Sequence, residues 1–280
     1  MNKMFAAIMV FIGYISFSHA ALPLEQLLYK GMAVPFYGDA ASAGQQQLLD
    51  AVKRSNLAER MASMTNLNMR LKHNIGVGFE SCGSINAFFS PQRRAVVICT
   101  EFVEMVVKLA TNDKEVMGKM SRESFVKAID GLIWGIYFHE LAHALITTNG
   151  IPITGREEDV ADQFAVWFSL NFMDLSRTPI LMPTIWFWRE LGKGRNIPAM
   201  NQDELRHFMS DEHSLNEQRV YNMACWAYGT NSALGNAAAK YAGLPEQRAQ
   251  RCASEYETAD RGMMMHFKKY LKVKPLSGRW

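Results

Sequence analysis

Two short polar runs in this chain could do metal chemistry: HELAH at positions 139–143 and EDVAD at positions 158–162. The first run has the pattern HExxH, whose histidines lie four residues apart and therefore share one face of a helix. His139 and His143 can direct two imidazoles at one ion, and Glu140 lies beside them, where it can polarise a bound water. Zinc prefers nitrogen and oxygen donors in a tetrahedral arrangement, and a catalytic zinc keeps one position for water. The pattern therefore predicts a catalytic zinc site whose third protein ligand comes from elsewhere in the chain.

The second run offers that third ligand from the next expected helix. The turn signal at Asn149-Gly150 lets this helix fold back on the first one, which brings Glu158 towards the two imidazoles. Asp162 follows Glu158 by one turn on the same face and can accept the second N–H of a ligating histidine, which fixes its tautomer. Two alternatives are open: Glu157 could be the third ligand, although it shares a face with Asp162 less well, or Asp162 could bind the metal itself. The i, i+4 pairing favours Glu158 as the ligand and Asp162 as the hydrogen-bond partner of a ligating histidine.

A chance HExxH on an ordinary helix is the plainer explanation of the first run. It would place two histidines and Glu140 beside Phe138, Leu141 and Leu145. Ionisable groups buried among so many apolar side chains cost free energy unless they are paired or bound to metal. The second motif, one loop further along, argues against coincidence.

The first twenty residues have the features of a secretory signal peptide. Lys3 gives a short positive region, residues 5–17 are mainly apolar, and Ser18 and Ala20 put small residues at the positions that signal peptidase reads. We predict cleavage after Ala20 and a secreted or periplasmic mature chain. A retained membrane anchor is the alternative, but the apolar stretch is short for a span. No later segment is a credible span, so we expect no stable membrane span after cleavage.

Composition and charge narrow the classes of partner. The chain has 280 residues, of which 49% are hydrophobic and 20% charged, as in ordinary globular proteins. Its net charge of +3 is too small and too dispersed to indicate a nucleic-acid partner. The sequence gives no indication of an oligomeric state.

The four cysteines form an even set in a chain that is expected to be exported, which favours disulfides. Three pairings are open, and Cys82–Cys99 with Cys225–Cys252 is the local one, in which each bond closes a modest loop. A cysteine metal site is the other interpretation, but the chain has no CxxC spacing.

The pattern of elements predicts an α+β fold, a mostly helical domain with a small antiparallel sheet. Loose alternation over 66–80 indicates strands, and residues 85–89 and 94–99 form an expected hairpin with its turn at 90–93. Ser121 is a plausible N-cap for a long helix that ends at Asn149-Gly150. The other expected helices cover 48–64, the segment from 101 on, 156–174, 215–228 and 246–271.

The two metal motifs resemble those of the glutamate-type zincins, the thermolysin-like peptidases that combine HExxH with a downstream ligating glutamate. Three features are similar to the CAAX prenyl proteases and their bacterial membrane relatives: the E-x-x-A-D run, the N-A-F run at 86–88, and the H-x5-R spacing from His213 to Arg219. The order of these motifs is also the same. The chain departs from that family because Ser214 replaces a proline, because transmembrane helices are lacking, and because the loop between the zinc motifs is short.

A better match over most of the mature chain is the group of exported bacterial proteins named putative metallopeptidases, whose substrates are unassigned. The run GREED at 155–159 carries this similarity, as does the segment from Asp211 to Trp226. The resemblance implies a zincin fold with one zinc ion. We therefore expect residues 21–280 to form a single zincin-like metallopeptidase domain.

The resemblance implies a role for each matching residue of the metal site. His139, His143 and Glu158 would hold the zinc, with Asp162 behind a histidine. Glu140 would take a proton from the zinc-bound water and pass it to the leaving amine. Zinc lowers the pKa of that water towards ~7, which makes hydroxide available at neutral pH.

The same resemblance implies how a substrate is held. Asn86, Ala87 and Phe88 would pair with its backbone, as an extended peptide adds a strand to the edge of a sheet. His213 or Arg219 would donate to the oxyanion of the tetrahedral intermediate, an interaction typically worth ~3 kcal/mol of barrier. Plainer interpretations are a helix cap or a surface residue for His213 and a structural salt bridge for Arg219.

The sequence thus predicts a zinc-dependent peptidase, a hydrolase that acts on a peptide or protein substrate outside the cytoplasm. One alternative is a non-catalytic scaffold of zincin fold whose metal serves stability. The intact Glu140 argues against it, and structural zinc sites usually have four protein ligands. Another alternative is a zinc amidase that acts on the cell wall, for which the same polar groups would serve.

Overall fold

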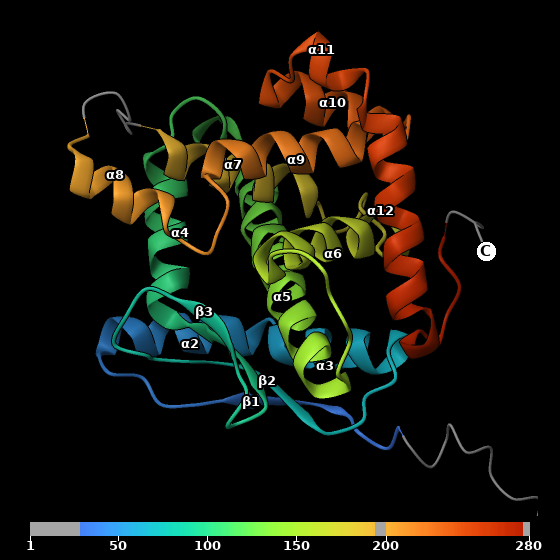
Figure 1. Cartoon of the computed structure of the whole chain (residues 1–280). Coiled ribbons are helices and arrows are strands. Elements are labelled where there is room, and N and C mark those ends of the chain that lie inside the picture. Colours follow the sequence, from blue (N-terminus) through green and yellow to red (C-terminus); the bar gives the residue numbers. More distant parts are fainter. Residues whose placement is uncertain (1–28, 194–199, 277–280) are drawn as a thin grey trace, which may run out of the picture.

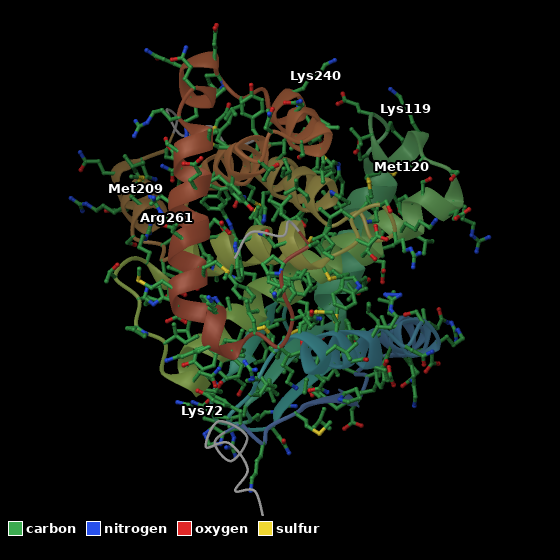
Figure 2. All side chains as sticks on the ribbon, turned by 90° about the vertical axis from the view of Figure 1, so that its right-hand side faces the viewer. Lys72, Lys119, Met120, Met209, Lys240 and Arg261 are labelled. Carbon is green, nitrogen blue, oxygen red and sulfur yellow. A yellow bond between two sulfur atoms is a disulfide. The ribbon has the colours of Figure 1, made fainter. Side chains whose placement is uncertain are left out.

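The computed structural model describes residues 29–193 and 200–276, so the expected signal peptide, 1–20, and its cleavage site lie outside the described residues. Helices dominate, and one small sheet accompanies them, which confirms the α+β, mostly helical class. In Figure 1 the sheet lies at the lower edge of the molecule, and most helices of the C-terminal third lie above it. The long helix α5 (Arg122–Asn149) runs between these two layers. The last long helix, Cys252–Phe267, instead runs down one side to the level of the sheet, and Figure 2 shows that side facing the viewer.

The sheet has four strands in the order β1-β2-β4-β3: β1 (Ala33–Tyr37), β2 (Ile75–Glu80), β3 (Ala87–Ser90) and β4 (Ala95–Cys99). The expected hairpin is present, because β3 pairs antiparallel with β4. The expectation of an antiparallel sheet is otherwise wrong, since β1 pairs parallel with β2 and β2 pairs parallel with β4. The chain passes from β1 to β2 through helices, and such a crossover returns it in the same direction.

The helices largely follow the expected pattern, with differences at breaks. The expected helix at 48–64 is two helices that separate at Ser55 and Asn56, where Asn56 has a positive φ of 51°. The expected last helix, 246–271, is likewise divided. The strand signal before position 72 belongs mainly to the end of a helix, followed by isolated bridges at Met69 and Leu71. The helices not yet given are α2 (Ala43–Arg54), α3 (Leu57–Asn68), α4 (Thr100–Asn112), α6 (Glu157–Phe172), α7 (Leu181–Gly192), α8 (Gln202–Met209), α9 (Asn216–Tyr228), α10 (Ala233–Ala242), α11 (Glu246–Ala249) and α12 (Cys252–Phe267).

Helix α5 begins and ends where its sequence indicates. The Ser121 hydroxyl accepts a hydrogen bond from the Ser124 N–H at its start, and Gly150 adopts a left-handed φ of 64° at its end. Nearly every residue from position 131 to position 146 is buried, so this part of the helix is enclosed on all sides. A helix in that position can hold polar side chains only where neighbouring elements supply partners for them.

Two disulfides join Cys82 to Cys99 and Cys225 to Cys252, which confirms the local pairing. The first bond ties the loop before β3 to the end of β4, and the second ties α9 to the start of α12. Within the described parts of the chain, no helix is long and apolar enough to cross a membrane.

Candidate metal centre

Two helices bring together three side chains that could bind a metal, one of them buried and two partly buried. His139 and His143 lie on α5, and Glu158 lies in the first turn of α6. The two imidazole Nε2 atoms are 3.2 Å apart. The Glu158 carboxylate places Oε2 at 3.0 Å from the Nε2 of His139 and Oε1 at 3.4 Å from that of His143. These three residues are one of the groups among the described residues whose donor atoms converge closely enough to hold a metal ion.

The separations between these donors fit a zinc ion. Zinc bonds of ~2.0–2.2 Å place two donors of a tetrahedron roughly 3.4 Å apart, close to the separations of the three donor atoms. Two imidazoles and one carboxylate are also the kind of donor set that catalytic zinc sites use, which leaves a fourth position for water. The residues present therefore fit the metal that the sequence predicts.

Each imidazole of the site has a carboxylate on its other ring nitrogen. The Nδ1 of His139 lies 2.8 Å from Asp162 Oδ1, and the Nδ1 of His143 lies 2.7 Å from Glu157 Oε1. Contacts of this kind fix the tautomer of a histidine and would direct its Nε2 at a bound metal. The structure thus places Glu157 and Asp162 behind the histidines and Glu158 between them.

Arg219 on α9 is almost fully buried and points at Asp162. Its Nε donates to Oδ2 at 2.7 Å and its Nη2 to Oδ1 at 2.6 Å, and its guanidinium lies 3.4 Å from the centre of the Trp188 ring. A buried carboxylate without a cation would cost several kcal/mol. Arg219 therefore supports the carboxylate that orients His139. This contact is the structural salt bridge that the sequence analysis gave as the plainer interpretation of Arg219.

His213 reaches the site from the loop that precedes α9. Its Nε2 lies 3.1 Å from Glu158 Oε2, and its Nδ1 lies 3.0 Å from Asp211 Oδ1. The loop is fastened to the start of α6, because Ser214 Oγ donates to Asp159 Oδ1 at 2.6 Å and Arg156 Nη2 donates to the Asp211 carbonyl at 2.8 Å. His213 is 43% exposed and stands at the open side of the three donors.

Glu140 faces a cleft beside the metal donors. The cleft has a volume of about 230 Å³, and both Glu140 and His139 line it. Burial raises the pKa of Glu140. The charges of His139 and His143 lower it in part, as does, to a smaller degree, a hydrogen bond from the Phe89 backbone N–H on β3. The carboxylate is therefore held between the metal donors and the edge of the sheet.

The edge strand β3 meets the same cleft. Asn86 accepts a backbone hydrogen bond from Cys99 on β4, so the alternation of an antiparallel pair turns the N–H and C=O groups of Ala87 and Phe89 away from β4. Asn86 and Ala87 line the cleft, whereas Phe88 does not. The structure therefore brings two of the three expected substrate-binding residues to the site.

A model of a protein family described as "Putative metallopeptidase" matches residues 37–263. The chain belongs to this family. The match spans every residue of the site described above and both disulfides. Neither a curated protein nor a solved structure matches the chain.

The charges around the two histidines fit a site for a cation, as expected in a metallopeptidase family. Carboxylates surround the two imidazoles, and Arg219 is the guanidinium that faces them. Burial lowers the pKa of His139, but hydrogen bonds to Asp162 and Glu158 outweigh it and raise the value to about 10. Burial raises the pKa of Glu158, yet hydrogen bonds from the histidines bring it well below its usual range. This excess of negative charge is what a divalent cation would neutralise.

Sequence reasoning missed the apolar wall of the cleft. Trp188 and Leu191 of α7 form part of it, and the sequence analysis did not assign either residue to the site. No local pattern identifies the wall, because α7 meets side chains of α4 and α5 there only after folding. The other apolar residues of the wall are Ile85, Phe102, Met105, Ile136 and Phe187.

Proposed function

We propose that this member of the metallopeptidase family is a zinc-dependent peptidase that hydrolyses peptide bonds with Glu140 as the general base. The observation that carries the proposal is the placement of Glu140. It lies next to a His139, His143 and Glu158 donor set and lines a cleft whose wall includes a strand edge. Those donors would hold one zinc ion, which would supply Lewis acidity to polarise a carbonyl and acidify water near neutral pH.

The chain's own residues would then carry the proton and the charge. Glu140 would accept a proton from the attacking water and deliver it to the nitrogen of the leaving amine. His213, at the open side of the donors, would donate to the oxyanion that forms on the carbonyl. Arg219 would act through Asp162 and His139, because its guanidinium is engaged there.

The difference between the two edges of the sheet is evidence for a peptide substrate. On β1 the side chain of Asn66 bonds both the N–H and the C=O of Ala33, and Pro35 has no N–H, so this edge is protected from pairing. On β3 the outward groups of Ala87 face the cleft beside Glu140. An extended peptide could add to that edge, which would place its backbone alongside the catalytic carboxylate.

A scaffold with structural zinc is less well supported. Structural zinc sites usually have four protein ligands, whereas the group that converges among the described residues has three. The strand edge in the cleft also favours a peptide over the alternative of another amide substrate. We retain the proposal of a signal peptide at 1–20 and a single domain at 21–280, and the two disulfides fit a secreted or periplasmic protein.

The test is Glu140→Gln in the zinc-loaded protein. We expect zinc to remain stoichiometric by elemental analysis, while hydrolysis of a peptide library falls by about 10²–10⁴-fold because the proton acceptor is lost. Glu104→Gln, an exposed carboxylate on α4 paired with Lys108, is the matched control and should leave both readouts unchanged. Full hydrolysis by Glu140→Gln would contradict the proposal, as would a wild-type protein that binds no zinc.

A further inference from the structure

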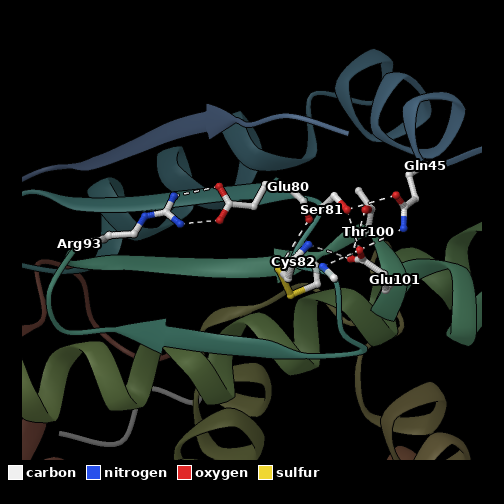
Figure 3. Close-up of a disulfide and its surroundings, with 9 residues drawn as sticks. Gln45, Glu80, Ser81, Cys82, Arg93, Thr100 and Glu101 are labelled. Carbon is white, nitrogen blue, oxygen red and sulfur yellow. Dashed lines mark hydrogen bonds and ion pairs between the residues drawn. A yellow bond between two sulfur atoms is a disulfide. The ribbon is translucent and has the colours of Figure 1, made fainter. Parts of the chain in front are cut away.

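A second carboxylate organises the loop that leads to the cleft. Glu101 lies in the first turn of α4, and its carboxylate accepts hydrogen bonds from the loop between β2 and β3 (Figure 3). The donors are the Ser81 hydroxyl at 2.6 Å and the backbone N–H groups of Cys82 at 3.0 Å and Gly83 at 2.9 Å. The Gln45 amide of α2 adds another at 3.0 Å. One side chain thus collects three donors from three successive residues of the loop.

The Cys82–Cys99 disulfide acts on the same loop. Cys99 ends β4, forms the disulfide with Cys82, and donates its backbone N–H to the Asn86 carbonyl at 3.1 Å. The loop is therefore held near its start by Glu101 and the disulfide and at its end by the Cys99 N–H. We call this arrangement of Glu101 and the Cys82–Cys99 disulfide the clasp.

Apart from the clasp, a backbone hydrogen bond from Ser81 to the Asp39 carbonyl at 2.8 Å holds the start of the loop, and little apolar contact holds the rest. The side chains of residues 83–86 are exposed, and Ile85 is 61% exposed. Gly83 adopts a left-handed φ of 72°, a conformation that the Glu101 hydrogen bond helps to fix. Because almost no apolar surface is buried here, polar contacts and the disulfide must offset the conformational entropy of the loop.

The residues that follow the clasp form the wall of the cleft. Ile85, Asn86 and Ala87 line it together with Glu140. A displacement of the loop would therefore move the strand edge against the catalytic carboxylate. Hydrogen bonds from Ser81, Cys82 and Gly83 outweigh the effect of burial and lower the pKa of Glu101 to about 2, so the carboxylate is charged at neutral pH.

We propose that the clasp sets the position of the substrate-binding edge of β3, and that Glu101 is a positioning residue for peptide binding. This inference rests on the proposed peptidase function and names the part of the chain that fixes its substrate edge. A substrate that pairs with a mobile edge must order it on binding, and that cost weakens affinity. The clasp removes the cost in advance. Its loss should raise KM for extended peptides and leave kcat nearly unchanged, because Glu101 touches none of the reacting groups.

The experiment compares two zinc-directed probes on wild type, Glu101→Gln and Glu104→Gln. The first probe is acetohydroxamate, which is too small to reach the strand edge. The second is a peptide hydroxamate long enough to pair with β3. We expect Glu101→Gln to lower the affinity for the peptide hydroxamate by about tenfold and the affinity for acetohydroxamate by less than about twofold. Glu104→Gln, one turn along α4 and in an exposed ion pair, should bind both probes as wild type does.

Amide hydrogen exchange gives a readout that does not depend on activity. Glu101→Gln should speed exchange across residues 81–90 and leave the peptides of α5 and α6 unchanged. Ser81→Ala removes one donor without changing charge, so it should shift both the peptide affinity and the exchange in the same direction by a smaller amount. If Glu101→Gln does not fold, Ser81→Ala still tests the inference through the same two measurements.

The outcomes separate the clasp from the proposed function. The positioning role would be overturned if the affinities for both probes fell equally. It would also be overturned if amide hydrogen exchange at 81–90 stayed unchanged in either variant. If wild type binds neither probe, the peptidase proposal fails while the exchange measurement still reports on the loop. A fall in kcat at constant KM would also contradict the inference, because it would assign Glu101 to the chemical step.

Discussion

At the scale of single residues, each histidine of the candidate centre is oriented by a carboxylate on its Nδ1. His139 relies on Asp162, which relies in turn on Arg219, and all three are nearly excluded from solvent. His143 relies on Glu157, whose side chain is 41% exposed. The two imidazoles therefore have the same kind of partner in very different surroundings. Electrostatic support is stronger where water is excluded.

This difference predicts unequal effects of two similar substitutions. Asp162→Asn should lower zinc affinity by about 10–100-fold, because a buried partner of a metal-binding histidine is lost and Arg219 is left without its carboxylate. Glu157→Gln should lower it by a smaller factor, because water can replace an exposed partner. Zinc competition with a chromophoric chelator at neutral pH measures both. An effect of Glu157→Gln as large as that of Asp162→Asn would show that burial does not set the strength of the support.

The sequence predicted the residues whose spacing is local. HExxH and E-x-x-A-D place their side chains by helical periodicity, so His139, His143 and Glu158 could be named together before any fold was known. Arg219 on Asp162 and Trp188 against Arg219 could not, since they join helices α6, α7 and α9 across the fold. For Arg219 the sequence left a catalytic donor and a salt bridge open, and only tertiary contacts distinguish them.

At the scale of elements, His213 depends on how its loop is attached to α6. Ser214 Oγ donates to Asp159 Oδ1 at 2.6 Å, next to the helix residue that His213 itself contacts, Glu158. Arg156, at the start of the same helix, adds a hydrogen bond to the Asp211 carbonyl. The exposed segment around His213 buries little surface, so these few polar contacts, the Ser214 hydrogen bond among them, place the imidazole. The helix that presents the third metal donor thereby also places the expected oxyanion donor.

Ser214→Ala should therefore lower kcat by about tenfold through misplacement of His213, with zinc content unchanged. Ser254→Ala is the control. The Ser254 hydroxyl also donates a hydrogen bond, to the Arg251 carbonyl, but it lies on α12 and not in the loop that carries His213. Steady-state kinetics on a peptide found in the library screen measures the effect. If Ser214→Ala keeps the wild-type kcat while His213→Ala loses it, the loop does not depend on this contact. If His213→Ala also keeps it, His213 has no catalytic role.

At the scale of the whole molecule, the sheet shows where sequence reasoning reached its limit. The hairpin of β3 and β4 was predictable, because its strands are adjacent and a turn joins them. Strand β1 was not, since AVPFY has no clear alternation and contains a proline. Its parallel partner β2 lies beyond two helices, so neither the pairing nor its direction left a local signal. The sheet was therefore expected to be antiparallel, whereas most of its pairings are parallel.

A zinc ion held by the proposed donors should also contribute to the stability of the entire fold, because those donors lie on two different helices, α5 and α6. Removing zinc leaves the carboxylates around the two imidazoles without a cation, and a ligand that binds only the folded state stabilises it by about 2.7 kcal/mol at a hundredfold excess over Kd. For a chain of this size that corresponds to a fall in Tm of roughly 5–10 °C when zinc is chelated. Thermal melts with a chelator, and then with zinc restored, measure the shift. His143→Ala is the control and should melt at the same temperature in both conditions. If the Tm of the wild type is the same with and without the chelator, the three side chains do not hold a metal in the folded protein.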